Sequence, residues 1–337
     1  MTSREIVHQT LAFQNPERVP RQLWVLPWAN LHCKDGVEGI ERDFPMDFGG
    51  VDGGEREKPP TQGDPYEIGT HVDAWGAKFH NMQRGVIGEV KEPLIVGEDW
   101  EDAGKAHIPC ELLTIDPDHI NRQCAASSRF IMAGECPRPF EQLQFLRGTE
   151  NLYMDLAYQS SGMMAFLEKM HDFYCSWVEA WAKTDVDGIM FMDDWGSQKS
   201  LLINPVTWVE IFKPMYRDYI NIAKKYNKKT FMHSDGYTLQ IIPHLIELGL
   251  DAFNTQIFCM GMEPLKQFKG EITFWGEMDR QHMLVTATPE EVRQAVRGVF
   301  DALWAEGGCI AQCEFGAGGK TENVRAVYEA WDEVLRK

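Results

Sequence analysis

The chain has 337 residues, 44% of them hydrophobic and 25% charged, and it carries 51 acidic side chains against 33 basic ones. The net charge of −18 argues against nucleic acid and anionic membranes as partners, because both are bound through patches of Lys and Arg. No apolar stretch approaches the roughly 18 residues of a membrane-spanning helix, and the N-terminus lacks the apolar core of a signal peptide. We therefore expect a cytoplasmic protein whose eight scattered cysteines are reduced.

The N-terminal part of the chain combines helical, strand and loop patterns without a regular repeat. Apolar residues at helical spacing predict a helix over 3–13. An apolar run predicts a first strand within 19–26, and a weaker candidate follows at 46–49. Glycine, proline and charged residues indicate a surface loop over 50–70, and 71–90 has the pattern of a strand-and-turn excursion.

From residue 128 onward, short apolar strands alternate with helices. The predicted strands are 129–134, 188–192, 229–233, 251–254, 271–276 and 308–312. The predicted helices are 139–146, two within 151–183, 206–226 and 289–303. This alternation is typical of a parallel sheet, and the two N-terminal candidates bring the strand count to eight. The pattern predicts an α/β fold, a (β/α)8 TIM-like barrel that occupies 1–337 as a single domain with N-terminal helical and loop extensions.

Three residues of metal-ligand type end predicted strands: His233, Glu277 and Cys313. Imidazole nitrogen, carboxylate oxygen and thiolate sulfur are the ligand types that zinc takes, and a catalytic zinc site has three protein ligands and one open position. Since catalytic residues of such barrels sit at the C-terminal strand ends, we expect these three to bind Zn²⁺. The alternatives are a core histidine for His233, a solvated acid or an acid paired with Arg280 for Glu277, and a buried apolar thiol for Cys313.

Other candidate residues follow the same strand ends. We expect catalytic roles for Asp235 and Asp194. Asp235 could instead form the turn, orient His233 or bind the metal. Asp194 and its neighbour Asp193 could form a metal or acid–base pair, cap a helix or bind substrate. Asn254 is expected to bind substrate, with backbone pairing as its alternative. Aromatic candidates for the wall of a substrate pocket, against the alternative of ordinary core packing, are Trp24, Trp28 and Trp195.

Several segments together resemble the uroporphyrinogen decarboxylase superfamily. They are FMDDWGSQ, HSDG, FWGEMDRQ and the segment GAGGKTENVRAVYEA that follows Cys313, and they keep their order over nearly the whole chain. The resemblance implies a distorted (β/α)8 barrel. The decarboxylases themselves carry an Arg-Gln-Ala-Gly-Arg-Tyr motif whose arginines hold substrate carboxylates. Here the corresponding region begins Arg21-Gln22-Leu23-Trp24, so the arginine pair is missing.

The chain is more similar to the zinc-dependent corrinoid methyltransferases of this superfamily. His233 and Cys313 match zinc ligands of the coenzyme M branch, whose middle Cys is replaced by Asp235. Fewer thiolates leave zinc a stronger Lewis acid, which suits an ether oxygen. The resemblance therefore implies O-demethylation: a methyl group passes from a small methylated donor, an aryl methyl ether, to the cob(I)amide of a separate corrinoid protein. Methyl transfer from a methylcorrinoid to a thiol or tetrahydrofolate and cofactor-free decarboxylation are the alternatives.

Overall fold

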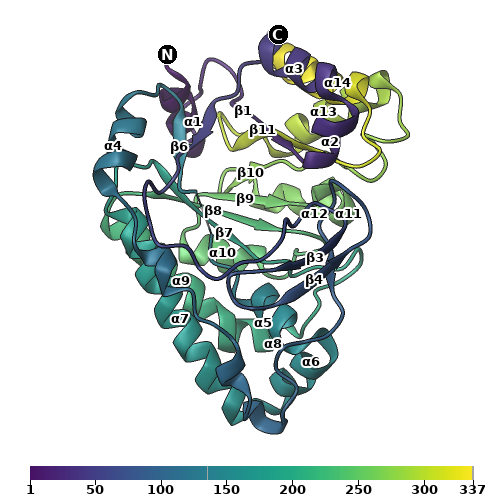
Figure 1. The fold of residues 1–337 in the computed structure, drawn as a ribbon. Coiled ribbons are helices and arrows are strands. Elements are labelled where there is room, and N and C mark those ends of the chain that lie inside the picture. Colours follow the sequence, from purple (N-terminus) through teal and green to yellow (C-terminus); the bar gives the residue numbers. More distant parts are fainter. Residues whose placement is uncertain (135, 336–337) are drawn as a thin grey trace.

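The computed structural model describes residues 1–134 and 136–335, and a barrel of eight parallel strands lies at its centre (Figure 1). The strands are hydrogen-bonded in the order β1-β11-β10-β9-β8-β7-β6-β2. They are β1 (Arg21–Val25), β2 (Phe48–Gly50), β6 (Phe130–Met132), β7 (Gly188–Met192), β8 (Lys229–Ser234), β9 (Ala252–Thr255), β10 (Thr273–Trp275) and β11 (Cys309–Phe315). All eight coincide with predicted strands, so the barrel expected from the sequence is confirmed.

The two ends of this strand order, β1 and β2, meet at a seam that Asp47 bridges. The Asp47 carboxylate is fully buried and accepts hydrogen bonds from the Arg18 guanidinium at 2.5 and 2.6 Å. It also accepts from the backbone N–H of Arg21 at 2.8 Å, and the Asp47 backbone N–H donates to the Arg21 carbonyl at 3.0 Å. A charge pair with a buried carboxylate therefore takes the place of a regular ladder where the barrel closes.

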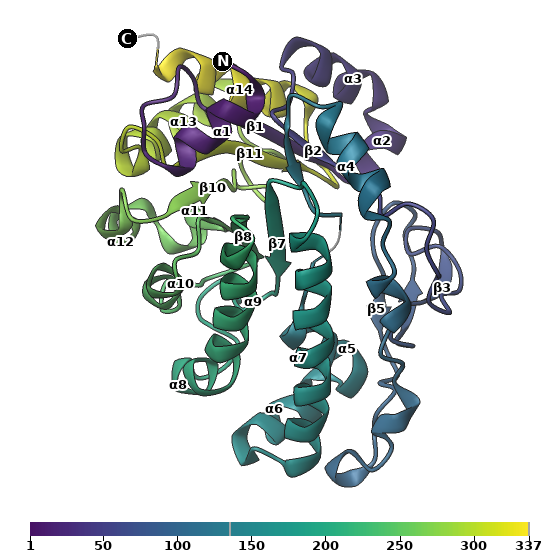
Figure 2. The ribbon, with the colours of Figure 1, turned by 90° about the vertical axis from the view of Figure 1, so that its left-hand side faces the viewer.

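Helices surround the strands. They are α1 (Ser3–Leu11), α2 (Pro27–His32), α3 (Lys34–Asp43), α4 (Pro117–Ala125), α5 (Pro139–Arg147), α6 (Thr149–Tyr158), α7 (Ser161–Ala182), α8 (Pro205–Thr207), α9 (Lys213–Lys225), α10 (Ile242–Leu248), α11 (Ile257–Met260), α12 (Met262–Leu265), α13 (Pro289–Leu303) and α14 (Thr321–Val334). Short 3₁₀ helices cover Glu98–Trp100, Ala103–Lys105, Cys110–Leu113 and Lys266–Phe268. The long helices α7 and α9 lie side by side, as do α13 and α14 (Figure 2).

The helix predicted over 206–226 occurs as three pieces. A π-helical turn, Trp208–Phe212, separates α8 from α9. Pro214 stands in the first turn of α9 and has no N–H to donate to the preceding turn, which accounts for the change in winding there. The predicted excursion over 71–90 is an antiparallel sheet outside the barrel, formed by β3 (Gly69–Val72), β4 (Lys78–Asn81) and β5 (Glu89–Val90).

Apolar side chains fill the barrel lumen near the N-terminal ends of the strands. This buried cluster contains Val7, Leu11, Phe48, Phe130, Met132, Phe231, Ala252, Trp275 and Ile310. The first two belong to α1, so this helix closes the N-terminal end of the barrel, and the polar side chains described below gather at the opposite end. No helix among residues 1–134 and 136–335 has the length and apolar character needed to cross a membrane.

Candidate metal centre at the barrel mouth

His233, on β8, projects into the lumen with one ring nitrogen fixed by a buried amide. Its Nδ1 lies 2.6 Å from Oδ1 of Asn254 on β9. The Asn254 Nδ2 group donates to Oε1 of Gln312 at 3.0 Å and to the carbonyl of Trp275, so its Oδ1 must accept from the imidazole. The proton therefore sits on Nδ1 of His233, and Nε2 presents its lone pair to the barrel mouth. Such a partner on the second nitrogen is the usual arrangement for a metal-binding histidine.

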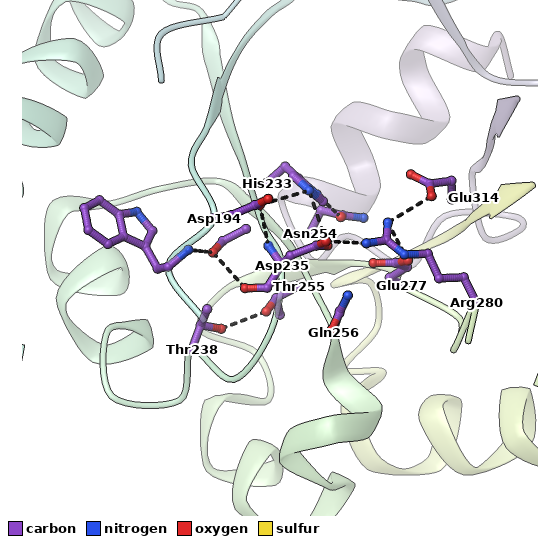
Figure 3. A network of polar contacts seen from close by, with 12 residues as sticks. Asp194, His233, Asp235, Thr238, Asn254, Thr255, Gln256, Glu277, Arg280 and Glu314 are labelled. Carbon is purple, nitrogen blue, oxygen red and sulfur yellow. Dashed lines mark hydrogen bonds and ion pairs between the residues drawn. The ribbon is translucent and has the colours of Figure 1, made fainter. Parts of the chain in front are cut away.

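Two carboxylates lie next to this free nitrogen (Figure 3). The Nε2 atom of His233 is 3.7 Å from Oδ1 of Asp194, which follows β7, and 3.6 Å from Oδ1 of Asp235, which follows β8. The Asp235 N–H donates to Asp194 at 3.0 Å, which ties the two loops together. Gly236 has φ +79° and packs on Gly196, and a Cβ there would lie 2.1 Å from the Gly196 carbonyl oxygen. A glycine is therefore required for this close approach of the loops.

These three side chains fit a metal ion. Their ligand atoms all lie within 4.8 Å of one another. Zinc bound tetrahedrally by nitrogen and oxygen at 2.0–2.2 Å would space its ligand atoms about 3.4 Å apart, close to the separations from His233. Oδ1 of Asp235 is buried and has no hydrogen-bond partner among the residues that the structure describes. An orphaned buried carboxylate oxygen beside a free imidazole nitrogen is the donor set that a cation would satisfy.

Glu277 lies in the same polar network but outside this group of three. Its side chain is buried, and neither carboxylate oxygen has a hydrogen-bond partner within the described residues. Burial raises the pKa of Glu277 to about 8, against the lowering effect of Arg280, whose Nη1 is 3.3 Å from Oε1. The same guanidinium contacts Asp235 and, at 3.0 Å, Glu314 at the end of β11. Glu277 is thus a partner of Arg280 in this structure, which was the alternative to metal binding.

Cys313 is not brought together with His233. Side chains alternate along a strand, and on β11 it is Gln312 and Glu314 that point into the lumen. Cys313 faces the helical layer instead, where its fully buried Sγ lies 3.5 Å from the hydroxyl of Tyr328 on α14. Burial raises the pKa of this thiol to about 12, which disfavours the thiolate. In this structure Cys313 therefore lies on the helix-facing side of β11, away from His233.

The three predicted pocket tryptophans have different surroundings. The Trp24 ring lies 5.2 Å from the His233 ring, edge to face, at the top of the lumen. Trp28 is on α2, where its ring is 4.7 Å from that of His32. Trp195 is fully buried and stacks on Phe140 at 4.3 Å, so it packs in the core and cannot line an open pocket.

Asp193, the neighbour of Asp194, serves the fold. Its buried carboxylate accepts from the backbone N–H groups of Phe140 and Glu141 at 3.1 and 2.7 Å, at the start of α5, and from the Tyr216 hydroxyl at 2.5 Å. Helix capping, which the sequence left open for this pair of aspartates, therefore holds for Asp193. Asp194 points to His233 instead, so adjacent identical residues have separate roles.

Several polar residues of the mouth were missed by sequence reasoning. Glu314 directly follows the singled-out Cys313, and strand alternation would have placed one of the two in the lumen. Gln312 gave no signal beyond the same alternation. Glu141 on α5 is paired with Arg138 at 3.1 Å, and burial raises the pKa of Glu141, with Asp194 nearby acting in the same direction. No sequence pattern indicates that this helix contributes to the mouth.

A cavity of about 170 Å³ opens beside Arg280. Its lining residues are Gln198, Gln256, Phe258, Cys259, Glu277, Asp279, Arg280, Gln281 and His282. Arg280 lines this cavity and also contacts Asp235, so the cavity adjoins the group around His233. A ligand in this cavity would lie beside the candidate metal centre.

Among solved structures, the chain is similar to a methyltransferase from Methanosarcina mazei, with 12% identity, 99% of each chain covered and a TM-score of 0.64. An endo-β-1,4-xylanase from Gloeophyllum trabeum matches with 10% identity, a TM-score of 0.40 and coverage of 65% of this chain and 81% of that chain. A 3-keto-D-glucoside 4-epimerase from E. coli matches with 10% identity, a TM-score of 0.39 and coverage of 66% and 85%. At 12% identity the match to the methyltransferase shows a shared fold, and the other two matches are too weak to indicate a relationship.

A search of curated protein sequences gives no match. The sequence profile of the uroporphyrinogen decarboxylase (URO-D) family, in contrast, matches residues 65–334. This span contains the group around His233, its Asn254 support and the Arg280 network. By this match over most of its length, and by its eight-stranded barrel, the chain belongs to the uroporphyrinogen decarboxylase family.

Proposed function

We propose that the chain is a zinc-dependent methyltransferase that demethylates a small aryl methyl ether and passes the methyl group to the cob(I)amide of a separate corrinoid protein. The observation that carries the proposal is the free Nε2 of His233 beside the orphaned Oδ1 of Asp235 and the carboxylate of Asp194. The family and the fold likeness to a methyltransferase support it.

In this proposal His233, Asp194 and Asp235 hold the ion, in place of the set His233, Glu277 and Cys313 expected from the sequence. A zinc ion held by nitrogen and oxygen would supply Lewis acidity to the ether oxygen. Asn254 keeps the His233 proton on Nδ1, so that Nε2 stays available. His233 lies on β8, and Asp194 and Asp235 follow β7 and β8, which leaves the β10 and β11 side of the mouth for a substrate.

The other side chains have roles that follow from their positions. Trp24, next to the His233 ring, offers an aromatic surface to the part of the donor that reaches the metal group. In the transfer the bond between the methyl carbon and oxygen breaks, cobalt supplies the electron pair for the new bond, and the phenolate oxygen keeps the old one. In the metal-free chain burial raises the pKa of the Glu277 carboxyl to about 8, so this carboxyl is suited to give a proton to the departing phenolate.

The acceptor must come from outside the chain. Direct displacement requires cobalt, methyl carbon and leaving oxygen in line, so a bulky corrinoid has to approach over the barrel mouth. The net charge of −18 gives the chain an acidic surface that a basic face of a partner would complement. Association steered in this way weakens as salt is added.

Decarboxylation of a polycarboxylate is less well supported by the site. Arg280, the guanidinium next to the metal group, is already paired with Asp235, Glu277 and Glu314. A substrate with several carboxylates would meet like charges there. Methyl transfer in the opposite direction, from a methylcorrinoid to a thiol or tetrahydrofolate, uses the same mouth and is separated from our proposal by the assay below.

The test is a spectral assay with the zinc-loaded chain, a methoxylated phenol and a reduced corrinoid protein. We expect loss of the cob(I)amide absorption together with stoichiometric release of the demethylated phenol. Omission of either protein should abolish both signals, and His233→Ala should do the same. Demethylation by the chain without any corrinoid would contradict the mechanism. Methylation of a thiol or tetrahydrofolate, with no reaction of any ether, would favour the reverse direction.

A further inference from the structure

Around the cavity, Arg280 is paired with carboxylates, so within the part of the chain that the structure describes it is not free to receive an anionic ligand. Arg280 is held by carboxylates that come from three different strand ends: Asp235 after β8, Glu277 after β10 at 3.3 Å, and Glu314 on β11 at 3.0 Å (Figure 3). The Glu314 side chain is largely buried, and its carboxylate accepts a hydrogen bond from the Arg280 guanidinium. A substrate carboxylate could pair with Arg280 only by displacing one of these residues.

A bound divalent cation would not change this balance. Asp194 and Asp235 together would offset its two charges, and Glu314 would still offset Arg280. The second guanidinium near the mouth, Arg138, is paired with Glu141 at 3.1 Å. The occupied site therefore has no excess of positive charge, and a carboxylate on the substrate would approach Glu314 and Asp279 without a partner of its own.

The cavity next to Arg280 has the size and lining for one uncharged ring. Its volume is about 170 Å³, and an apolar cavity of about 150 Å³ admits benzene. Gln198, Gln256, Phe258 and Cys259 supply amide, aromatic and thiol surface. Amide groups of this kind can hydrogen-bond a phenolic hydroxyl.

We propose, on the basis of the function proposed above, that the site selects an uncharged single-ring methyl donor and discriminates against donors that carry a carboxylate. Glu314 is the specificity-determining residue, because it keeps Arg280 occupied. Replacing Glu314 by glutamine removes one charge from the network without changing the size of the side chain. Arg280 then becomes available to a carboxylate on the ring.

The test compares two rings that differ by one carboxylate, 2-methoxyphenol and 4-hydroxy-3-methoxybenzoate, whose binding to the zinc-loaded chain is measured by calorimetry. We expect the wild type to bind the neutral ring at least tenfold more tightly. Glu314→Gln should reduce this ratio at least tenfold by improving binding of the benzoate, whereas Glu314→Asp should keep the wild-type ratio. The matched control is Glu271→Gln, which removes an exposed charge before β10, at the other end of the barrel.

Equal or tighter binding of the benzoate by the wild type would overturn the proposal, as would binding of neither ring. An unchanged ratio in Glu314→Gln, with a melting temperature like that of the wild type, would overturn the role of Glu314. Because binding does not require a corrinoid protein, the outcome is independent of methyl transfer. Selective binding without any transfer would refute the proposed function and leave the charge selectivity intact.

Discussion

Replacing Asn254 by alanine should weaken the metal centre without touching a metal ligand. Asn254 is fully buried, and it connects Nδ1 of His233 at 2.6 Å to Oε1 of Gln312 at 3.0 Å and to the carbonyl of Trp275. The alanine variant loses the acceptor that keeps the imidazole proton on Nδ1. Loss of such an outer partner typically weakens metal binding about 10–100-fold, which corresponds to roughly 1.4–2.8 kcal/mol.

The same substitution also leaves buried polar groups unpaired, at about 1–3 kcal/mol for each group that water cannot reach. Stability and metal affinity must therefore be separated. Asn323→Ala is a matched control, because Asn323 is equally buried and donates to the carbonyls of Met283 and Ala287 at 3.0 and 2.9 Å, away from His233. Both variants should melt several degrees below the wild type.

Zinc dissociation constants, measured by competition with a chelator, distinguish a loss of metal affinity from a loss of stability. We expect a 10–100-fold increase for Asn254→Ala and a wild-type value for Asn323→Ala. Equal zinc affinity in the two variants, with both destabilised, would show that Asn254 serves packing alone. In that case the tautomer argument for His233 would be refuted.

Three further predictions concern the mouth and the barrel. Burial raises the pKa of Glu277 from 4.5 to about 8, so the folded metal-free chain keeps a proton that the unfolded chain loses between these pH values. The free energy of unfolding should therefore fall by up to about 1.4 kcal/mol per pH unit as the pH rises through this range. Denaturant titrations of Glu277→Gln should lack this pH dependence. Asp47→Asn removes the carboxylate charge that pairs with Arg18 at the seam and should lower stability by about 2 kcal/mol in denaturant titrations, with wild-type zinc affinity. Trp24→Leu should weaken binding of 2-methoxyphenol about tenfold in calorimetry, whereas Trp195→Leu should lower the melting temperature and leave that affinity unchanged.

The barrel could be predicted from the sequence because its strands carry a strong local signal. Each is a short apolar run followed by turn residues, and even the weak candidate at 46–49 corresponds to β2 (Phe48–Gly50). The location of His233 at the end of β8 follows from the same pattern. Helices α2 and α3 were not expected, since 27–43 holds two glycines and scattered charges in place of a clear apolar repeat.

The composition of the site could not be predicted in the same way, because it depends on which face of a strand each side chain takes. A shift of one residue exchanges Cys313 for Glu314, and the apolar run before them is compatible with either register. Arg280 is three residues beyond Glu277, yet its contacts with Asp235 and Glu314 come from other strand ends. Contacts between residues so far apart in the chain cannot be recognised from the local sequence.

The ligand set of the metal centre is the claim most directly open to measurement. X-ray absorption at the zinc edge of the loaded chain distinguishes nitrogen and oxygen ligands, at about 2.0–2.2 Å, from sulfur, at about 2.3 Å. A centre formed by His233, Asp194 and Asp235 predicts a first shell of nitrogen and oxygen alone, unchanged in Cys313→Ser and lost in His233→Ala. A sulfur scatterer that disappears in Cys313→Ser would contradict this centre and would mean that β11 turns its thiol toward the lumen when zinc binds.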